Sequence, residues 1–563
     1  MQKRTSRSRK KTLPLRVIPL GGVMEIGKNM TAYEYGDQIL VVDAGLMFPE
    51  EEMLGVDIVI PDITYLEDNA EKVVGIVLSH GHEDHIGALP YVLRRIDVPV
   101  YGTALTLGFV SNKLQEHRLT DVARLNTVSA GDVLELGDFS VEYVRVSHSI
   151  PDASGLAIRT PAGTIFHCSD FKFDQTPIDG NLADIARLAR IGEEGVLLIM
   201  VDSTNVEKRG FTPSESLVGE SLQRIFAAAP GRIIVAAFAS NIHRVQQVHD
   251  IAARFGRRVA LVGRSMAENC RIAEELGYLK VPDGVRLRLD EIADVPRERT
   301  VIMTTGSQGE PLSALSKMAM DEHKHIKIDE GDTVIISATP IPGNEDLVLR
   351  TVNRLFSQGA DVIYEAHNAV HVSGHGNQDD IKLMLNLLRP RFAVPVHGEQ
   401  RHFAKFVALA RDLGFERERV FGLSPGDVLE VSADSAEVVG AVPAGNVMVD
   451  GLGVGDVGDV VLRDRRHLST DGVVIAVVGI DAGAKSLVSG PDIFSRGFVR
   501  EEQGEDLLQE AEGIVTAALE AMGNGEFQGD LDDIKAGCRK ALAKFIYERT
   551  HRRPVVVPII LEV

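Results

Sequence analysis

The segment 79–87, SHGHEDHIG, constrains this chain more than any other feature. Four ligand-type side chains fall within six residues of it: His80, His82, Asp84 and His85. Imidazole and carboxylate groups suit zinc and its neighbours, and Gly81 permits the turn that two histidines spaced by one residue need to face one ion. The apolar run 73–78 predicts a buried strand and 88–96 predicts a helix. We therefore predict that these four side chains bind a pair of metal ions on a strand-to-helix loop.

Two other interpretations of this motif are weaker. Ordinary polar loop residues explain a single histidine or a His-x-His pair, but seldom four ligand-type groups in six positions. A purely structural zinc site favours a cysteine-rich closed tetrahedron. The chain has only three cysteines, Cys168, Cys270 and Cys538, far apart in sequence. An odd, sparse set indicates a reducing compartment, so we expect a cytoplasmic protein without a disulfide framework.

Length and charge limit the class of protein. The 563 residues exceed what one hydrophobic core usually serves, so we expect several domains. A net charge of -21 argues against nonspecific binding to a polyanion, although a groove with bound cations and local basic residues can still take one. No apolar run is long enough to cross a bilayer, so no membrane partner is expected.

The beginning of the chain predicts a disordered basic tail over residues 1–14. Its first eleven residues hold six Lys or Arg, and no apolar residue follows Met1 among them. A transit peptide is a weaker interpretation, because the amphipathic apolar face is missing. The tail either contacts a nucleic-acid backbone or has no specific partner.

Histidine and aspartate recur where predicted strands stop. Between residues 15 and 208, short apolar strands alternate with turns, and Asp43, His148 and Asp170 each close or follow one strand. Loops at strand ends are where a scaffold commonly holds its active site. One polar residue at a strand end is commonplace, but with the 79–87 motif these residues complete a two-metal set.

The pattern changes within 209–369, where helix and strand alternate regularly. This rhythm predicts a parallel sheet with helices packed on it. The ligand pattern resumes in 370–380, VHVSGHGNQDD, and the strand 392–396 ends in His397. We therefore predict that the α/β block is inserted into the first domain, whose second part is 370–450.

The last part of the chain predicts a linker and a smaller domain. The Gly/Asp-rich stretch 451–463 reads as a linker or a series of turns. Residues 464–563 predict a small α/β domain, in which apolar side chains of 507–522 share one helical face. That face is either core or an interface, and core is the preferred interpretation.

These motifs resemble the metallo-β-lactamase fold that carries a β-CASP domain. The shared elements are Asp43, the 79–87 motif, His148, Asp170 and His397, with an α/β insertion before the last. A more specific resemblance, to ribonuclease J, covers 15–563 and rests on DSTN from 202, FASNIHRVQQ from 238, TTGSQGEP from 304, HVSGHGNQDD from 371 and PVHGE from 395. The implied fold class is α/β: a metallo-β-lactamase αββα sandwich with an inserted β-CASP α/β domain and a small C-terminal α/β domain.

The resemblance implies two divalent metal ions per subunit, zinc being expected and manganese or magnesium being the alternatives. The implied ligands form two sets that share a bridging Asp170: His80, His82 and His148 for one ion, and Asp84, His85 and His397 for the other. Asp84 would also orient the attacking water or accept its proton. Asp43 would support a ligand histidine from behind rather than bind metal.

The resemblance also implies a general acid, His375, that protonates the leaving 3′ oxygen of RNA. His371, Ser373 and Gly374 would contact the phosphate beside it, and Asp202 would orient a ligand or acid histidine. Alternatively, His371 and His375 are loop histidines that only pack near the metals.

A preference for a 5′ monophosphate, again implied by the resemblance, needs a pocket closed behind the first nucleotide. The candidates lie in two strand-end loops: Ser240, Asn241, His243, Gly306, Ser307 and Gln308. Hydroxyl, amide, imidazole and exposed backbone N–H groups can cradle a phosphate without a high positive charge. Alternatively, the same residue types serve as helix caps and turns.

The implied activity is that of a 5′-to-3′ exoribonuclease that also cuts internally, in rRNA processing and mRNA decay. The implied partners are single-stranded RNA, further copies of the chain in a homodimer or homotetramer, and an RNA-degradation or ribosome-associated assembly. A DNA nuclease or a 3′-end-processing endonuclease shares the metal motif, and a 2′-OH requirement would separate them. The complete ligand set argues against a noncatalytic RNA-binding scaffold, and the large insertion argues against a small-molecule hydrolase.

Overall fold

The computed structural model describes residues 13–50, 52–310, 312–341, 344–364, 369–481, 486–499, 501–521 and 531–562. Residues 1–12 of the predicted basic tail lie outside the described residues. The chain divides into two compact units, the larger with Met1–Phe48 and Val59–Val447, the smaller with Pro49–Ile58 and Met448–Val563. Among the described residues, every helix is too short or too polar to span a membrane.

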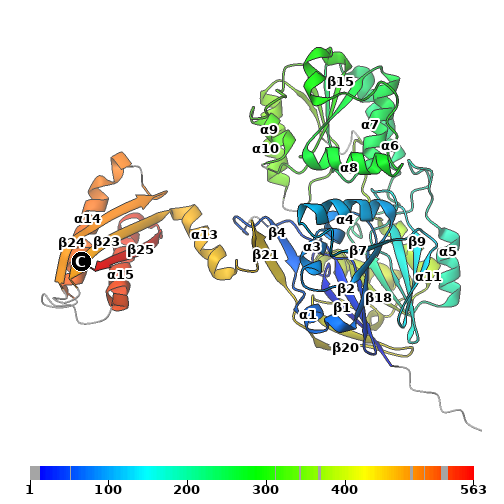
Figure 1. The fold of residues 1–563 in the computed structure, drawn as a ribbon, viewed down its shortest axis with the longest axis horizontal. Helices are drawn as coiled ribbons and strands as arrows, with labels where there is room; N and C mark the ends of the chain where they lie inside the picture. The colour runs from blue at the N-terminus through cyan, green and yellow to red at the C-terminus, as the bar shows by residue number, and fades with distance from the viewer. Residues whose placement is uncertain are drawn as a thin grey trace, which may run out of the picture. The chain divides into compact units, whose positions relative to one another are not determined.

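Two mixed sheets form the centre of the larger unit (Figure 1). The first has the order β20-β19-β1-β2-β3-β5-β6-β7. Its strands are β1 (Leu15–Gly21), β2 (Met30–Tyr35), β3 (Gln38–Val42), β5 (Val73–Val77), β6 (Pro99–Gly102), β7 (Arg124–Thr127), β19 (Asp427–Val431) and β20 (Ala436–Ala441). The second has the order β18-β12-β11-β10-β9-β8. Its strands are β8 (Val133–Leu136), β9 (Phe139–Arg145), β10 (Ser154–Thr160), β11 (Gly163–His167), β12 (Leu198–Asp202) and β18 (Phe392–Val396).

The two sheets bury their inner faces against each other. Alternate residues of the first sheet, such as Val17 and Tyr33, pack in one cluster with Val141 and Leu156 of the second. Apolar side chains spaced two apart on a strand share a face, so this alternation produces a continuous inter-sheet core.

Helices cover both outer faces of this sandwich. On the first sheet lie α1 (Thr64–Asp68), α3 (Leu89–Leu93) and α4 (Ala104–Glu116). On the second lie α5 (Ile185–Glu194), α11 (Gln378–Leu388) and α12 (Gln400–Asp412). The four layers confirm the predicted αββα sandwich.

A five-stranded parallel sheet, in the order β14-β15-β13-β16-β17, forms the inserted block (Figure 1). Its strands are β13 (Ile233–Ala236), β14 (Arg258–Val262), β15 (Thr300–Thr304), β16 (Thr333–Ile336) and β17 (Asp361–Ile363). One face packs on α6 (Ser216–Ala228), α7 (Ile242–Arg254) and α8 (Arg264–Glu275), and the other on α9 (Ala314–Ala319) and α10 (Glu345–Ser357). Strands β12 and β18 pair directly, with Asp202 opposite Val396, although the whole inserted block lies between them in the sequence. The insertion is therefore confirmed.

The larger part of the smaller unit is a three-stranded sheet, in the order β24-β23-β25, with helices on one side. Its elements are α13 (Asp459–Asp471), β23 (Val473–Asp481), β24 (Ser486–Arg496), α14 (Glu501–Ala521), α15 (Leu531–Thr550) and β25 (Val555–Glu562). Ala511, Val515 and Leu519 of α14 are at most 1% exposed and belong to the core, whereas Ile514 of the predicted face is 37% exposed and Met522 lies outside the described residues.

The predicted linker 451–463 is only partly irregular. Gly453–Val454 forms β22, and α13 begins at Asp459, inside that range. Gly458 stays extended at the N-cap, and the residues after it, VVLRDRRHL, contain enough helix formers to continue as helix. The remaining elements are β4 (Ile58–Pro61), β21 (Asn446–Asp450), the short helix α2 (Glu83–Ile86), and the 3₁₀ turns Ala70–Lys72, Leu289–Asp294, Arg297–Arg299 and Arg417–Arg419.

Candidate metal centre and active site

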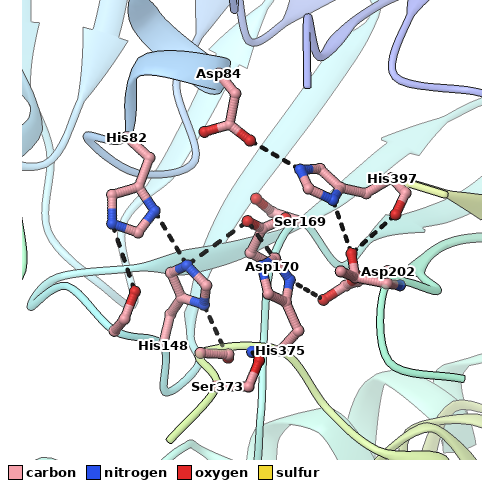
Figure 2. A network of polar contacts seen from close by, with 12 residues as sticks. His82, Asp84, His148, Ser169, Asp170, Asp202, Ser373, His375 and His397 are labelled. Atoms are coloured by element: carbon pink, nitrogen blue, oxygen red, sulfur yellow. Dashed lines mark hydrogen bonds and ion pairs between the residues drawn. The ribbon is translucent and has the colours of Figure 1, made fainter. Parts of the chain in front are cut away.

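Strand-end loops bring the predicted ligands together at one edge of the sandwich (Figure 2). The parallel strands β11, β12 and β18 are direct neighbours. Their carboxyl ends therefore lie together. Asp202 ends β12, Asp170 and His397 follow β11 and β18, and these three side chains lie side by side. The 79–87 loop follows β5, and its short helix α2 (Glu83–Ile86) carries two further candidate ligands.

Three histidines and Asp170 converge on one point. His82 Nδ1 lies 3.1 Å from both His80 Nε2 and His148 Nε2. Asp170 Oδ2 lies 3.7 Å from His80 Nε2 and 3.6 Å from His148 Nε2. Two nitrogens bound tetrahedrally to zinc lie roughly 3.3 Å apart, so the spacing of these donors fits one divalent ion.

The protonation state of these histidines suits metal binding. Burial lowers the pKa of His82 to about 4. Burial also holds the pKa of His80 and of His148 well below the usual range. Neutral imidazoles keep a free lone pair, which is the form that binds metal.

A second set of donors shares Asp170 with the first. His397 Nε2 lies 2.8 Å from Asp84 Oδ2, and His85 Nε2 lies 3.4 Å from Asp170 Oδ2. The ligand atoms within each set lie within 4.8 Å of one another. Burial lowers the pKa of His397, but the carboxylates of Asp170 and Asp84 outweigh burial and raise it to about 9. Carboxylates that attract a proton so strongly attract a divalent cation in the same way.

Groups behind the ligands fix how the imidazoles point. Asp43 Oδ2 lies 2.8 Å from His85 Nδ1, and both Asp43 oxygens accept hydrogen bonds from Ser79, through its backbone N–H and its hydroxyl. All of these atoms are buried. A carboxylate that holds the far nitrogen of a ligand histidine fixes its tautomer and its orientation. Asp43 therefore lies behind His85 in the structure, and its supporting role stays a prediction.

Other ligand histidines have supports that the sequence interpretation missed. Thr204 Oγ1 lies 2.7 Å from His397 Nδ1. The hydroxyl of Ser169 lies 3.3 Å from His80 Nδ1, and the carbonyl oxygen of Gly374 lies 2.9 Å from His148 Nδ1. The one sequence signal that could have indicated Thr204 is its hydroxyl two residues after the strand-end aspartate of DSTN.

The amide of Asn29 is a further missed group. Its Nδ2 donates to the backbone oxygen of Asp84 at 3.1 Å and lies 3.1 Å from His85 Nε2. Asn29 follows a turn just before β2, far from the motif in sequence, so nothing local indicated its role.

His375 and Asp202 form a pair beside the metal donors. Asp202 Oδ2 lies 2.8 Å from His375 Nδ1, and Asp170 Oδ2 lies 3.8 Å from the same nitrogen. The His375 ring also stacks on the His397 ring, with centroids 5.1 Å apart. Burial lowers the pKa of His375, but Asp202 and then Asp170 outweigh burial and raise it. The predicted general acid therefore lies in the cluster, in an environment that favours its protonated form.

His371 lies outside the three groups of ligand-type residues. Its buried Nδ1 has no hydrogen-bond partner among the residues that the structure describes. Burial, reinforced by the positive charges of Arg244 and Lys172, lowers the pKa of His371 to about 3. A neutral His371 can donate a hydrogen bond to phosphate, but it offers no positive charge. Its catalytic role stays a prediction.

The two loops predicted to bind a 5′ phosphate lie at one edge of the inserted sheet. Strands β13 and β15 are parallel neighbours, with Ala236 opposite Thr304, so the loops after them are adjacent. The Asn241 side chain accepts from the backbone N–H of Arg244 and caps α7. The Gln308 amide bridges to the backbone of Thr339 and Ile341. For these two residues the alternative of caps and turns describes the observed contacts.

Among the remaining residues of these loops, His243 and Gly306 have local structural features of their own. His243 Nε2 is buried without a hydrogen bond among the described residues and lies 3.7 Å from Asp179 Oδ2. Gly306 has a φ of 105°, a conformation that favours glycine. No side-chain hydrogen bond is recorded for Ser240 or Ser307 within the described part of the chain.

Known families match the chain along most of its length. Residues 25–233 match the metallo-beta-lactamase superfamily, 230–355 the ribonuclease J beta-CASP domain, 359–420 the Zn-dependent metallo-hydrolase RNA specificity domain, and 460–563 the ribonuclease J C-terminal domain.

Curated relatives match over nearly their full length. Ribonuclease J2 of Bacillus subtilis (strain 168) is 44% identical over 99% of this chain and 100% of its own. Ribonuclease J of Thermus thermophilus is 46% identical over 97% and 95% respectively. A solved structure of a protein of unknown function from Enterococcus faecalis V583 has a TM-score of 0.52 at 17% identity, over 74% of this chain and 100% of that one. That last likeness shows the fold alone.

The fold and the His/Asp cluster define a hydrolytic nuclease of the metallo-β-lactamase superfamily with a β-CASP domain, which binds divalent metal and RNA. With relatives above 40% identity over the whole chain, the protein belongs to the ribonuclease J family and is a metal-dependent ribonuclease.

Proposed function

We propose that the protein is a two-metal 5′-to-3′ exoribonuclease. It degrades single-stranded RNA, prefers a 5′ monophosphate, and also cuts internally, in rRNA processing and mRNA decay. The observation that supports this most strongly is the pair of ligand sets that share the Asp170 carboxylate. The imidazole-rich donors of both sets favour zinc, and manganese or magnesium is the alternative.

Two cations at these sets would lower the pKa of an attacking water and neutralise charge on the reacting phosphate. Asp84 is the partly exposed carboxylate of the second set, at 30% side-chain exposure. It is therefore the group that orients the water and accepts its proton.

His375 donates a proton to the leaving 3′ oxygen. Its Nδ1 faces Asp202 at 2.8 Å, so the opposite nitrogen is the one available to the substrate. Asp202 also stabilises the charged imidazole before the transfer. Ser373 and Gly374, immediately before His375, provide a hydroxyl and backbone donors for the phosphate.

The 5′ monophosphate binds at the two loops after β13 and β15. Ser240, His243, Gly306 and Ser307 are the residues whose polar groups are available there, whereas Asn241 and Gln308 hold the loops in shape. Neutral donors of this kind allow an acidic chain to hold a phosphate. We further propose that the protein acts in the cytoplasm as a homodimer or homotetramer, within an RNA-degradation or ribosome-associated assembly.

The experiment that tests this function uses one single-stranded RNA labelled at its 3′ end. The RNA carries a 5′ monophosphate, triphosphate or hydroxyl, and the matched DNA is included. Chelator and His80→Ala remove the proposed metal binding, and His325→Ala, an exposed histidine of the inserted domain, is the matched control.

Metal-dependent shortening from the 5′ end, fastest for the monophosphate and absent for DNA, is the expected result. Equal cleavage of DNA would favour a DNA nuclease, and discrete internal cuts alone would favour an endonuclease. No cleavage of RNA by protein of verified metal content would contradict the proposal.

A further inference from the structure

We propose that Arg244 of the inserted domain is a positioning residue for the metal centre. It acts through the loop 370–375, which carries His375 and touches His148. The inference rests on the proposed function only where RNA cleavage is used as a readout.

Arg244 is a fully buried guanidinium, with 0% exposure, on helix α7. Its Nε donates to Glu215 Oε1 at 3.0 Å. Its Nη1 donates to the backbone oxygen of Val370 at 2.8 Å and to that of Ser337 at 3.3 Å, and it also contacts the Ser337 hydroxyl. One side chain therefore joins the starts of α6 and α7, the end of β16, and the chain as it leaves the inserted domain.

Val370 is the first residue of the loop that reaches the candidate active site. Four residues later, the Gly374 carbonyl oxygen holds His148 Nδ1 at 2.9 Å. Gly374 lies so close to the His148 ring that an added Cβ would come within 2.6 Å of it. A shift of this loop therefore moves the ring of a candidate metal ligand directly.

The other end of the loop is held by the sandwich domain. Asn205 Nδ2 donates to Ser373 Oγ at 2.8 Å and to the backbone oxygen of His375 at 3.0 Å. Arg244 supplies the corresponding hold from the inserted domain.

Two hydroxyls add to these holds: Ser337 Oγ donates to the backbone oxygen of Val370 at 2.6 Å, and Thr212 Oγ1 donates to that of His375 at 2.8 Å. Arg244 is the charged group among them, and it orients the Ser337 hydroxyl as well as the Val370 carbonyl.

The chemistry of the site requires arginine. A planar guanidinium presents five N–H donors in fixed directions and can reach Glu215, Ser337 and Val370 together, whereas lysine offers a compact charge on a flexible stem. Its ion pair with Glu215 is a second, separable role. Removing Arg244 alone would leave Glu215 buried and unpaired, which destabilises a fold by itself.

The test separates these two roles with a double substitution. Arg244→Met with Glu215→Gln removes both charges, so the buried charge no longer destabilises the protein. Arg232→Met with Asp332→Asn is the matched control, because it removes another buried pair of the same sheet, bonded through Arg232 Nε and Asp332 Oδ1 at 3.2 Å. That pair lies at the opposite edge, before β13 and β16. Arg244→Lys completes the set.

The readouts are zinc affinity by chelator competition, hydrogen exchange of 370–375, and steady-state cleavage of 5′-monophosphate RNA. We expect the double Arg244 variant to lose zinc affinity by about 10- to 100-fold, the range typical of groups that orient metal ligands. Exchange in 370–375 rises, and kcat falls more than KM changes, because the loop carries a catalytic group. The control pair keeps all three values within about twofold of wild type.

Wild-type zinc affinity and wild-type exchange in the double variant would overturn the proposal, as would an equal loss in the control pair. If the double variant does not fold, Arg244→Lys decides in the same way, since unchanged zinc affinity there would show that the charge alone is needed. Zinc affinity and exchange do not use RNA. A wild-type protein that fails to cleave RNA would therefore contradict the proposed function while these two readouts still decide the role of Arg244.

Discussion

Asp380 joins three segments at the junction of the sandwich and the inserted domain. Replacing its carboxylate should loosen one segment or all three, depending on the substitution. The carboxylate is fully buried, at 0% exposure. Its Oδ1 accepts from the backbone N–H of Phe173 at 2.9 Å. Its Oδ2 accepts from Thr212 at 2.7 Å and from Asn377 at 3.0 Å. These donors lie after β11, at the entry to the insertion and at the start of α11.

Asp380→Asn keeps an oxygen that can serve Thr212 and Asn377, but its amide nitrogen must then face the N–H of Phe173. The Phe173 N–H is then unsatisfied, which costs about 2 kcal/mol, or roughly 30-fold faster exchange of that amide, and the introduced side-chain N–H also lacks an acceptor there. Asp380→Ala leaves all three donors unsatisfied, with an upper bound of about 6 kcal/mol. The order of destabilisation is therefore wild type, then Asn, then Ala.

The assay is hydrogen exchange resolved to single amides, because one unfolding free energy is not well defined for a chain of several domains. In Asp380→Asn, only Phe173 should exchange faster, while Thr212 and Asn377 keep wild-type protection. In Asp380→Ala, all three should exchange faster. Equal effects of the two variants, or unchanged protection of Phe173 in both, would refute the reasoning that the three bonds act separately through this carboxylate.

Three further predictions concern the candidate active site. Asp43→Ala should weaken zinc binding by about 10- to 100-fold, because His85 loses the carboxylate that orients it, and chelator competition would detect this. Burial lowers the pKa of His375, but Asp202 outweighs burial and raises it, so the acid form persists to higher pH. Asp202→Asn should therefore move the alkaline limb of the kcat–pH profile to lower pH. An unmoved limb would count against His375 as the general acid. Stripping metal with a chelator should abolish RNA cleavage and added zinc should restore it, and cleavage that survives verified metal loss would exclude a metal mechanism.

The sequence could single out the candidate metal ligands, which the structure brings together, because their signal is local or lies at strand ends. Four of them fall within six residues, and the others follow β-strands whose ends meet. The supporting groups were missed because their partners are remote. Thr204 and His397 are 193 positions apart, so no spacing rule links them. Asn241 was assigned to a phosphate because a helix cap and a phosphate ligand use the same polar side chain.

Arg244 shows a second limit of sequence interpretation. On an amphipathic helix an arginine is normally placed on the solvated face, and only tertiary structure reveals that this one is buried with a carboxylate and three backbone or hydroxyl acceptors. The burial of Asp380 was hidden in the same way. An aspartate in the first turn of a helix is equally expected where that helix end is exposed to solvent, so its sequence position did not indicate a buried role.

These buried groups explain why the family-specific motifs extend beyond the metal ligands. In DSTN from Asp202, the aspartate holds His375, the threonine holds His397, and the asparagine holds the 373–375 loop. In HVSGHGNQDD, Gly374 supports His148 and Asp380 closes the junction. Most of these residues position other groups, and several of their bonds cross between chain segments on either side of the insertion. We therefore expect a nuclease of this architecture to need a rigid junction as much as it needs its ligands, since the proposed general acid lies on one segment and most of the candidate metal ligands lie on others.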